Sequence, residues 1–484
     1  MLDLAIRNGL VVDGTGAVPV EADVGIEKDR IVEIGDVGSA RQVLNADGLV
    51  VSPGFVDAHT HDDMQLCRDP HNRDKLLQGV TTVVCGSCGF SAFPHRPGRV
   101  SQDLLAADGP WSSFAEYAQV LNEQGIGPNM ATFVGHNTLL QHHASGVRGR
   151  GSTGSSSIIA DGVRQAVEQG ALGVSTGLIY ESGRDAATED LIELARAAAQ
   201  AGGLYSTHLR DEGDGLVPAI EEALAIGRES GAGVQISHLK TIGSKNWGTV
   251  GAALDIIDNA WAGGQDVGFD VYPYTAGSGP MAQYFDADDI DEPRAALVQI
   301  TRCRDYPHYE GRLLAEIART EGVDLVDLTR RVITAPRSVE TICVIFEIDE
   351  DDMRSVLAHP RAMVGSDGIP QDGGVPHPRL LGTFPRVLGQ YSRDEGLFDL
   401  PSAVQKTASL SAARYGLEGR GQIQPGAWAD LVVFDHKTIR DAGTYEHRRS
   451  PEGVRWVIVN GKVAVTPAGV SDTLSGRVLH RAET

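Results

Sequence analysis

The sequence predicts an α/β protein built on a (β/α)8 TIM-like barrel, with a small β domain formed by both chain ends and a helical insertion before the last barrel strand. Eight apolar, β-rich runs lie in the middle of the chain, and each ends in a polar residue that can carry chemistry. Helical patterns that close on glycine, as a helix C-cap does, separate several of these runs. The steps from His61 to Cys88 and from His208 to His238 cover 27 and 30 residues, about the length of one βα unit.

The eight runs contain the strands that we expect to form the barrel. In chain order they are GFVDAHTH, GVTTVVCGSC, NMATFVGH, GALGVST, GLYSTH, GVQISH, DVGFDVYPY and AMVGSD. The helical patterns between the middle runs are DGVRQAVEQG, LIELARAAAQAGG, LVPAIEEALAIGRESG and VGAALDIIDNAWAGG. Catalytic groups of such a barrel gather at the carboxyl ends of its strands, which is where the polar residues of these runs fall.

Both ends of the chain show the short alternating segments that are typical of antiparallel strands. Such segments are LAIRNGLVV near the start and VRWVIVNGKVAV near the end, where Asn460-Gly461 is a strong hairpin signal. We therefore expect residues 1–52 and 413–484 to form one small β domain beside a barrel at 53–412. A charged, helical segment at about 285–355 is the expected insertion.

Composition excludes several classes of protein. The chain of 484 residues has 42 Lys+Arg and 65 Asp+Glu, a formal net charge of −23, which repels nucleic acid and anionic lipid. No run of eighteen apolar residues offers a membrane span, and the N-terminus lacks the features of a secretory signal. We expect a cytoplasmic protein whose five cysteines are thiols or ligands, and whose partner is a small molecule.

Several potential metal ligands end the predicted strands. The candidates are His59, His61, Cys88, His208, His238 and Asp367. His59 and His61 are two apart in a strand and face the same side, while thiolate and imidazole are the donors that zinc prefers. Each residue alone has an ordinary explanation, since a buried Cys acts as a small hydrophobe and a strand-end His is usually just hydrogen-bonded. Six candidates at five strand ends argue against chance, so the sequence predicts a metal site.

Ten motifs spread over nearly the whole chain resemble those of one known family. They are VDAHTHDD, VGSCGFS, VGHNTL, GVSTGLIY, YSTHLRDE, ISHLK, DVYPYTAGS, VGSDG, HPRLLGTFPRVLG and GLEGRGQIQPGAWADLVVFD. In this order they resemble the D-aminoacylases, the N-acyl-D-amino-acid deacylases of the amidohydrolase superfamily. The H-x-H pair alone indicates the superfamily, whereas GSCGFS together with HPRLLGTFPRVLG is specific to this branch.

The resemblance implies how metal would be bound. It implies one tight zinc held by Cys88, His208 and His238. It also implies a second, weaker metal position near the remaining candidates, which are His59, His61 and Asp367. Many relatives in the superfamily use a carboxylated lysine as bridge, but the matching ligand here is a thiol, which is already anionic once deprotonated.

The chemistry of such a site is the hydrolysis of a linear amide. Zinc acidifies water and polarises the amide carbonyl, and Asp367 is the expected catalytic base and acid. A free carboxylate on the substrate needs local cations, for which Lys240 and Arg379 are the candidates. Tyr272 and Ser278 are the candidate hydroxyl donors. Arg379 lies in a Pro/Gly-rich segment that we expect to be a loop after the eighth strand.

Other interpretations stay open at this point. The first is a cyclic-amide hydrolase like a hydantoinase or dihydroorotase, the second a deacylase specific for N-acyl-D-glutamate or -aspartate, and the third a non-catalytic scaffold. The GVSTG motif around Ser175 matches a nucleophile elbow, but the predicted barrel lacks that context. The preference for D substrates comes from the resemblance alone. The sequence does not indicate which acyl groups and side chains are preferred, or whether the second metal position is occupied. It also leaves open the role of His136 and the choice between monomer and small homo-oligomer.

Overall fold

A computed structural model describes residues 1–95, 109, 111–143 and 153–481 of the chain. In the described part, no helix is both long and apolar enough to cross a membrane.

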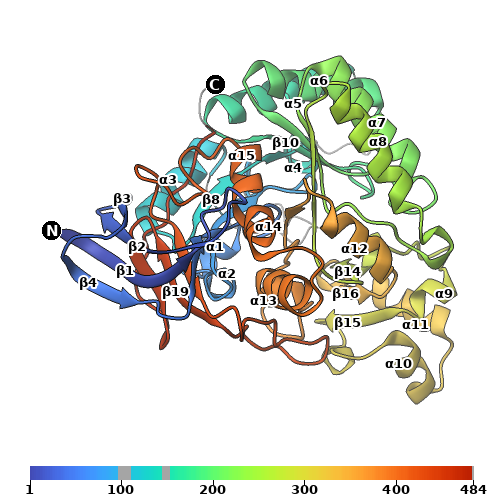
Figure 1. Ribbon diagram of the computed structural model, residues 1–484. Coiled ribbons are helices and arrows are strands. Elements are labelled where there is room, and N and C mark those ends of the chain that lie inside the picture. The colour runs from blue at the N-terminus through green and yellow to red at the C-terminus, as the bar shows by residue number, and fades with distance from the viewer. Residues whose placement is uncertain (96–108, 110, 144–152, 482–484) are drawn as a thin grey trace.

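Short parallel strands lie in the middle of the molecule among the helices (Figure 1), in two sheets that together make up the barrel. They are β6 (Phe55–Asp57), β7 (Val80–Cys85), β8 (Asn129–Thr132) continued by β9 (Val134–Gly135), β10 (Gly173–Gly177), β11 (Leu204–His208), β12 (Val234–Ile236), β13 (Val267–Val271) and β17 (Met363–Val364). β6, β7 and β8 are neighbours, and β9 to β13 and β17 follow in chain order. The amide of Ala58 donates to the Val364 carbonyl at 3.2 Å, which links the last strand to the first. All eight predicted strands are therefore present, in the expected order.

Helices surround this barrel and are joined to it by the loops that carry the site. They are α1 (Gln65–Arg68), α2 (Arg73–Leu76), α3 (Phe114–Gln124), α4 (His136–His143), α5 (Thr153–Glu168), α6 (Thr188–Gln200), α7 (Leu216–Ser230), α8 (Val250–Ala262), α12 (Glu350–Ala358), α13 (Arg379–Arg386), α14 (Leu400–Val404) and α15 (Leu410–Arg414). Two π-helical segments, 387–394 and 405–409, continue α13 and α14. α7 ends on Gly231 in the left-handed region, the glycine C-cap that its sequence predicts.

An inserted lobe, residues 277–345, lies between the seventh and eighth barrel strands. It contains α9 (Glu292–Ala295), α10 (Leu314–Glu321) and α11 (Leu325–Ile333), and four 3-10 turns lie at 244–246, 281–283, 307–309 and 338–340 in and near it. The lobe also contains an antiparallel sheet of β14 (Gly277–Pro280), β16 (Ile342–Ile345) and β15 (Val298–Arg302), so it is not purely helical as predicted. The strand Gly-Ser-Gly-Pro has no β-branched or aromatic residue, which explains why its sequence does not indicate a strand.

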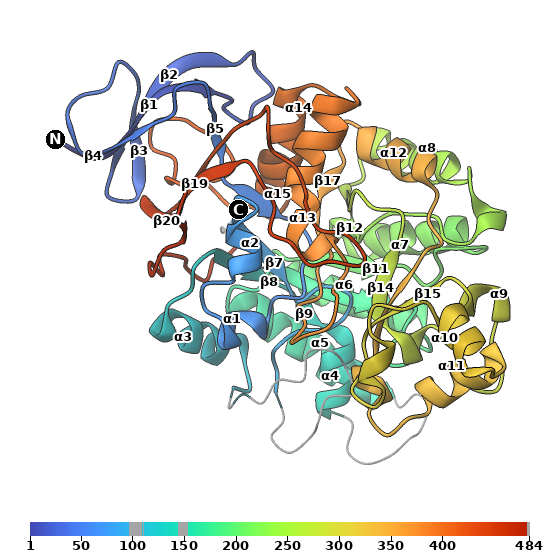
Figure 2. The same ribbon diagram turned by 90° about the horizontal axis from the view of Figure 1, so that it is seen from below.

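The two chain ends meet in a nine-stranded sheet at the opposite side of the molecule from the inserted lobe (Figure 2). The strands are β1 (Leu2–Val11), β2 (Val20–Glu27), β3 (Arg30–Gly35), β4 (Ala40–Asn45), β5 (Val50–Pro53), β18 (Leu431–Phe434), β19 (Val454–Val459), β20 (Lys462–Thr466) and β21 (Gly469–Val470). β5 pairs antiparallel with β18 and joins the two halves. Asn460 and Gly461 have positive φ in the turn between β19 and β20, as the hairpin signal requires. The domain boundaries at 52/53 and 412/413 stay a prediction.

Candidate active site

The six candidate ligands lie at the carboxyl ends of the barrel strands. His59 and His61 follow β6, Cys88 follows β7, and His208 ends β11. His238 follows β12, and Asp367 follows β17. Because the strands are parallel and adjacent, their ends bring these side chains to one rim of the barrel.

Three of these residues have a strained backbone. Cys88, His238 and Asp367 have φ of 55°, 36° and 48°, in the left-handed region that non-glycine residues rarely adopt. Each of them comes two or three residues after its strand ends. Strain of this kind persists only where the surrounding structure holds it, and it is concentrated at functional sites.

The sulfur of Cys88 lies among imidazole nitrogens. Its Sγ is 3.3 Å from Nε2 of His59 and 3.4 Å from Nε2 of His238. Two groups of donor atoms, each within 4.8 Å of one another, share this sulfur: one with His59 and His61, the other with His208 and His238. Cys88 is therefore placed to belong to both sets.

The first test of a metal site is whether its donors lack other partners. Nε2 of His208 is buried and has no hydrogen-bond partner among the described residues. It lies 3.5 Å from Oε2 of Glu212 without hydrogen-bond geometry, while its Nδ1 is 3.1 Å from the hydroxyl of Tyr180. An orphaned nitrogen beside a thiol sulfur fits a soft or borderline cation such as zinc.

Asp367 lies between the histidines and a buried arginine. Its Oδ1 is 3.2 Å from Nε2 of His61 and 3.6 Å from Nε2 of His59, and its Oδ2 is 2.9 Å from Nη1 of Arg379. The guanidinium of Arg379 stacks over the Tyr272 ring at 4.6 Å. The carboxylate thus faces both the candidate metal donors and the candidate substrate cation.

The charges of the cluster set its ionisation state. Burial disfavours the charged thiolate, but the imidazoles of His59 and His238 hold the pKa of Cys88 well below its usual value. Burial also disfavours the carboxylate of Asp367, but the charge of Arg379 holds its pKa well below the ordinary range. The site therefore keeps an anionic sulfur and an anionic carboxylate, both of which suit a metal cation.

Glu212 is a member of the site that the sequence analysis missed. Its Oε1 is 3.1 Å from Nδ1 of His238 and 2.5 Å from Nζ of Lys240. The position of Glu212 in the loop directly after β11, four residues beyond His208, was the available signal. Lys240 is consequently paired with a buried carboxylate, while its Nζ also lies 3.0 Å from Nδ1 of His238.

A layer of fully buried polar residues supports the site from below. Asp270 accepts the amide hydrogen of His238 at 3.0 Å, and its Oδ1 lies 3.3 Å from Nδ1 of His59. Lys75 donates to Asp57 at 2.8 Å and to the Ser366 hydroxyl at 2.6 Å. These contacts fix the loops that precede the candidate ligands, as partners behind metal ligands commonly do.

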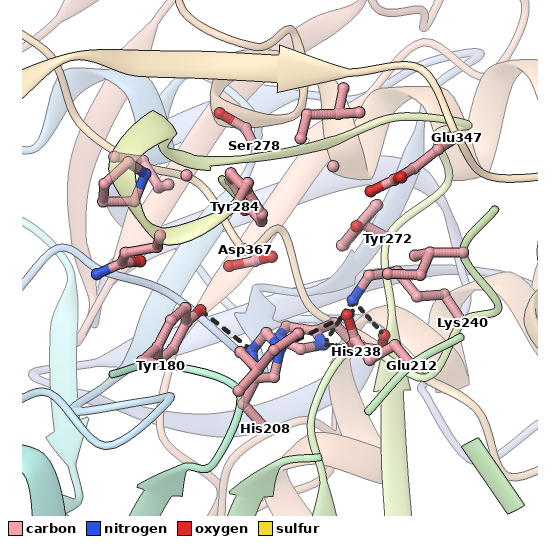
Figure 3. Close-up of a pocket in the computed structure, with 18 of the residues that line it drawn as sticks. Tyr180, His208, Glu212, His238, Lys240, Tyr272, Ser278, Tyr284, Glu347 and Asp367 are labelled. Carbon is pink, nitrogen blue, oxygen red and sulfur yellow. Dashed lines mark hydrogen bonds and ion pairs between the residues drawn. The ribbon is translucent and has the colours of Figure 1, made fainter. Parts of the chain in front are cut away.

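The ligands open into a pocket between the rim and the inserted lobe. Figure 3 shows Asp367 between His208 and His238 on one side and Tyr284 on the other, with Tyr272, Lys240 and Glu347 around the same space. The hydroxyls of Tyr272 and Ser278 are buried without a hydrogen-bond partner among the described residues, and so is Nε of Arg379. Unsatisfied buried donors aimed into a pocket are suited to a polar ligand.

Some local predictions need correction. Arg379 begins helix α13 and does not lie in a loop, although it reaches the predicted site. β12 ends at Ile236, so Lys240 reaches the pocket through a loop and not along a continuing strand. Ser175 lies within strand β10, and its hydroxyl donates to the Gly86 carbonyl. This agrees with the prediction that Ser175 is not a catalytic nucleophile. His136 starts α4, and burial lowers its pKa to about 4.

Comparison with known proteins identifies the group to which this site belongs. A sequence profile of the amidohydrolase family matches residues 42–465. The chain belongs to this family. Among amidohydrolase relatives, the chain is 41% identical to the D-aminoacylase of Alcaligenes xylosoxydans xylosoxydans, over 99% of this chain and 98% of that protein. The predicted family resemblance is therefore confirmed.

Solved amidohydrolase structures have the same architecture. A D-aminoacylase crystal structure has a TM-score of 0.92 and 41% identity, covering 99% of this chain and all of that one. The N-acyl-D-glutamate deacylase of Bordetella bronchiseptica, complexed with zinc and a phosphonate that mimics the tetrahedral intermediate, has a TM-score of 0.91 and 39% identity, covering 99% and 100%. The predicted fold class is confirmed by these matches and by the eight parallel strands of the barrel.

Proposed function

We propose that the protein is a zinc-dependent hydrolase that cleaves N-acyl-D-amino acids to a carboxylate and a free D-amino acid. The observation that carries this proposal is the convergence of Cys88 with His208 and His238, where both histidines line the pocket that also contains the Asp367–Arg379 pair. The D configuration follows the relatives, which are a D-aminoacylase and an N-acyl-D-glutamate deacylase. A cytoplasmic location and a monomeric or small homo-oligomeric state stay predictions.

The donor set divides into a tight site and a weaker position. Cys88, His208 and His238 would hold the zinc that the reaction needs. His59, His61 and Asp367, with Cys88 shared, would hold a second ion more weakly. When bound, zinc supplies Lewis-acid polarisation of the scissile carbonyl and acidifies water.

Asp367 would move the proton. Its carboxylate is kept ionised at neutral pH by Arg379, so it can accept a proton from the attacking water. The resulting acid can then donate that proton to the nitrogen of the departing amine. His61, 3.2 Å away, orients the carboxylate for this transfer.

Arg379 would bind the α-carboxylate of the substrate. Its Nε has no hydrogen-bond partner among the described residues. Nη1 is paired with Oδ2 of Asp367 at 2.9 Å, and Nη2 donates to the Ser278 carbonyl at 3.1 Å. The free hydroxyls of Tyr272 and Ser278 can complete the contact. Lys240 is paired with Glu212, as Arg379 is with Asp367, so net charge alone does not choose between the two cations. A planar guanidinium matches a carboxylate in a way that a lysine cannot.

A substrate panel with zinc-loaded enzyme tests the proposal. N-acetyl derivatives of amino acids in both configurations are compared with hydantoin and dihydroorotate. We expect turnover of the D derivatives and at most trace activity on L derivatives and cyclic amides. Faster turnover of a cyclic amide would replace the proposal with the cyclic-amide interpretation, and inactivity on every substrate would refute it.

A further inference from the structure

The wall of the pocket contains an ion pair that the proposed reaction does not use. Arg294 belongs to α9 of the inserted lobe, and Glu347 follows β16. Nε of Arg294 donates to Oε2 of Glu347 at 2.9 Å, and Nη2 donates to Oε1 at 2.8 Å. Both residues line the pocket, and Glu347 is buried. This bidentate fork places a closely paired, net-neutral unit in the wall.

The donors of Arg294 are committed to the protein. Besides the fork, Nη1 donates to the Tyr284 carbonyl at 3.4 Å, and the guanidinium lies over the rings of Tyr284 and Phe285 at 5.5 and 5.9 Å. Glu347 is held as well, because its carbonyl accepts the Trp247 indole hydrogen at 3.2 Å. Arg294 therefore differs from Arg379, whose Nε has no hydrogen-bond partner among the described residues.

The pocket that contains this pair also has apolar residues in its lining. Phe90, Ile179, Ile242, Pro280 and Ile345 line the same pocket. A second carboxylate on the substrate would have to break the fork or approach Glu347, and bringing like charges together in a buried site is strongly unfavourable. An uncharged side chain meets no such repulsion and gains burial against the apolar wall.

We propose that the Arg294–Glu347 pair sets the side-chain specificity of this protein: it selects N-acyl-D-amino acids with uncharged, apolar side chains and rejects acidic ones. This inference rests on the proposed function and makes it more specific. Glu347 acts as a specificity residue, because its charge cancels the cation that would otherwise attract a substrate carboxylate.

The test compares kcat/KM for N-acetyl-D-leucine and N-acetyl-D-glutamate in the wild type, in Glu347→Gln and in a matched control. The control is Glu452→Gln, which removes the same charge from an equivalent but exposed fork with Arg440, at 3.0 and 3.1 Å. We expect the wild type and the control to prefer N-acetyl-D-leucine. In Glu347→Gln, kcat/KM for N-acetyl-D-glutamate divided by kcat/KM for N-acetyl-D-leucine should rise by about tenfold or more, because the charge of Arg294 is no longer neutralised.

Each result decides between the proposals. A wild type that prefers N-acetyl-D-glutamate or N-acetyl-D-aspartate overturns the specificity inference and leaves the proposed function intact. An unchanged ratio in a folded Glu347→Gln variant also overturns the inference. If that variant does not fold, the wild-type ratio alone decides. Inactivity of the zinc-loaded wild type on every N-acyl-D-amino acid instead overturns the proposed function, and the inference with it.

Discussion

The barrel rim and the inserted lobe face each other across the pocket, but they hold their charges in different ways. At the rim, Cys88 and Asp367 are anionic. Near them, Nε2 of His208 and Nε of Arg379 have no hydrogen-bond partner among the described residues. In the pocket wall, Arg294 and Glu347 satisfy each other. Groups that react must keep unused bonding capacity, whereas groups that only shape a wall are most stable when they have none.

Removing the shared sulfur should have the largest effect on the rim. Cys88→Ala is expected to lose zinc and all measurable activity, because both donor groups contain this atom. Zinc content by atomic absorption is the measurement. Cys85→Ala is the matched control, since Cys85 is a buried thiol that contacts Thr60 inside the strand, and it should retain zinc. Full zinc content without Cys88 would contradict the ligand assignment.

Removing the proton acceptor should separate catalysis from metal binding. Asp367→Asn is expected to keep the tight zinc but to lower kcat by about 10²–10⁴-fold, the range for loss of a general acid–base group. Steady-state kinetics and zinc content are measured on the same preparation. A variant that turns over at the wild-type rate would exclude Asp367 from proton transfer.

The support beneath the rim is expected to control stability. Lys75→Met leaves Asp57 as an uncompensated charge in the interior, so the free energy of unfolding should fall by about 3–5 kcal/mol. Urea denaturation at pH 7 measures this loss. A change of less than about 1 kcal/mol, the contribution of an exposed ion pair, would mean that the Lys75–Asp57 pair does not stabilise the strand ends.

Replacing Arg379, the residue proposed to bind the substrate carboxylate, should change substrate binding more than the rate of reaction. Arg379→Lys replaces a planar fork with a point charge, so KM for N-acetyl-D-leucine should rise by about tenfold with a smaller change in kcat. An unchanged KM would remove Arg379 from the carboxylate role. Arg294 in the pocket wall differs from Arg379 in this respect, because Arg294 is not expected to contact the α-carboxylate of the substrate.

The smallest expected effect is on the pH dependence of stability, and it comes from Lys406, a buried lysine without a carboxylate partner among the described residues. Burial lowers the pKa of Lys406 to about 8, against about 10.4 for an unfolded lysine. The unfolded chain thus binds more protons between these values, and stability should rise as pH increases from about 8 to 10.4. Lys406→Met should abolish that contribution and should not destabilise the protein at pH 7. Urea midpoints across this pH range provide the test.

The sequence predicts the rim far better than the lobe, for a physical reason. Each barrel strand is an apolar run that ends in a chemically distinctive residue, so strand ends such as GVQISH and AMVGSD are visible without coordinates. The contact between Arg294 and Glu347 joins residues 53 positions apart through irregular backbone, and no local pattern encodes it. Glu212 lies between these cases, since only the fold shows that it reaches both His238 and Lys240.

The pairing of β5 with β18 has a consequence for how the protein is made. β5 ends at Pro53 and β18 begins at Leu431, so its partner strand is synthesised 378 residues later. At the usual speed of translation this interval lasts roughly 20 to 75 s. During that time β5 lacks its partner β18, and an unpaired strand edge of this kind can pair with another chain.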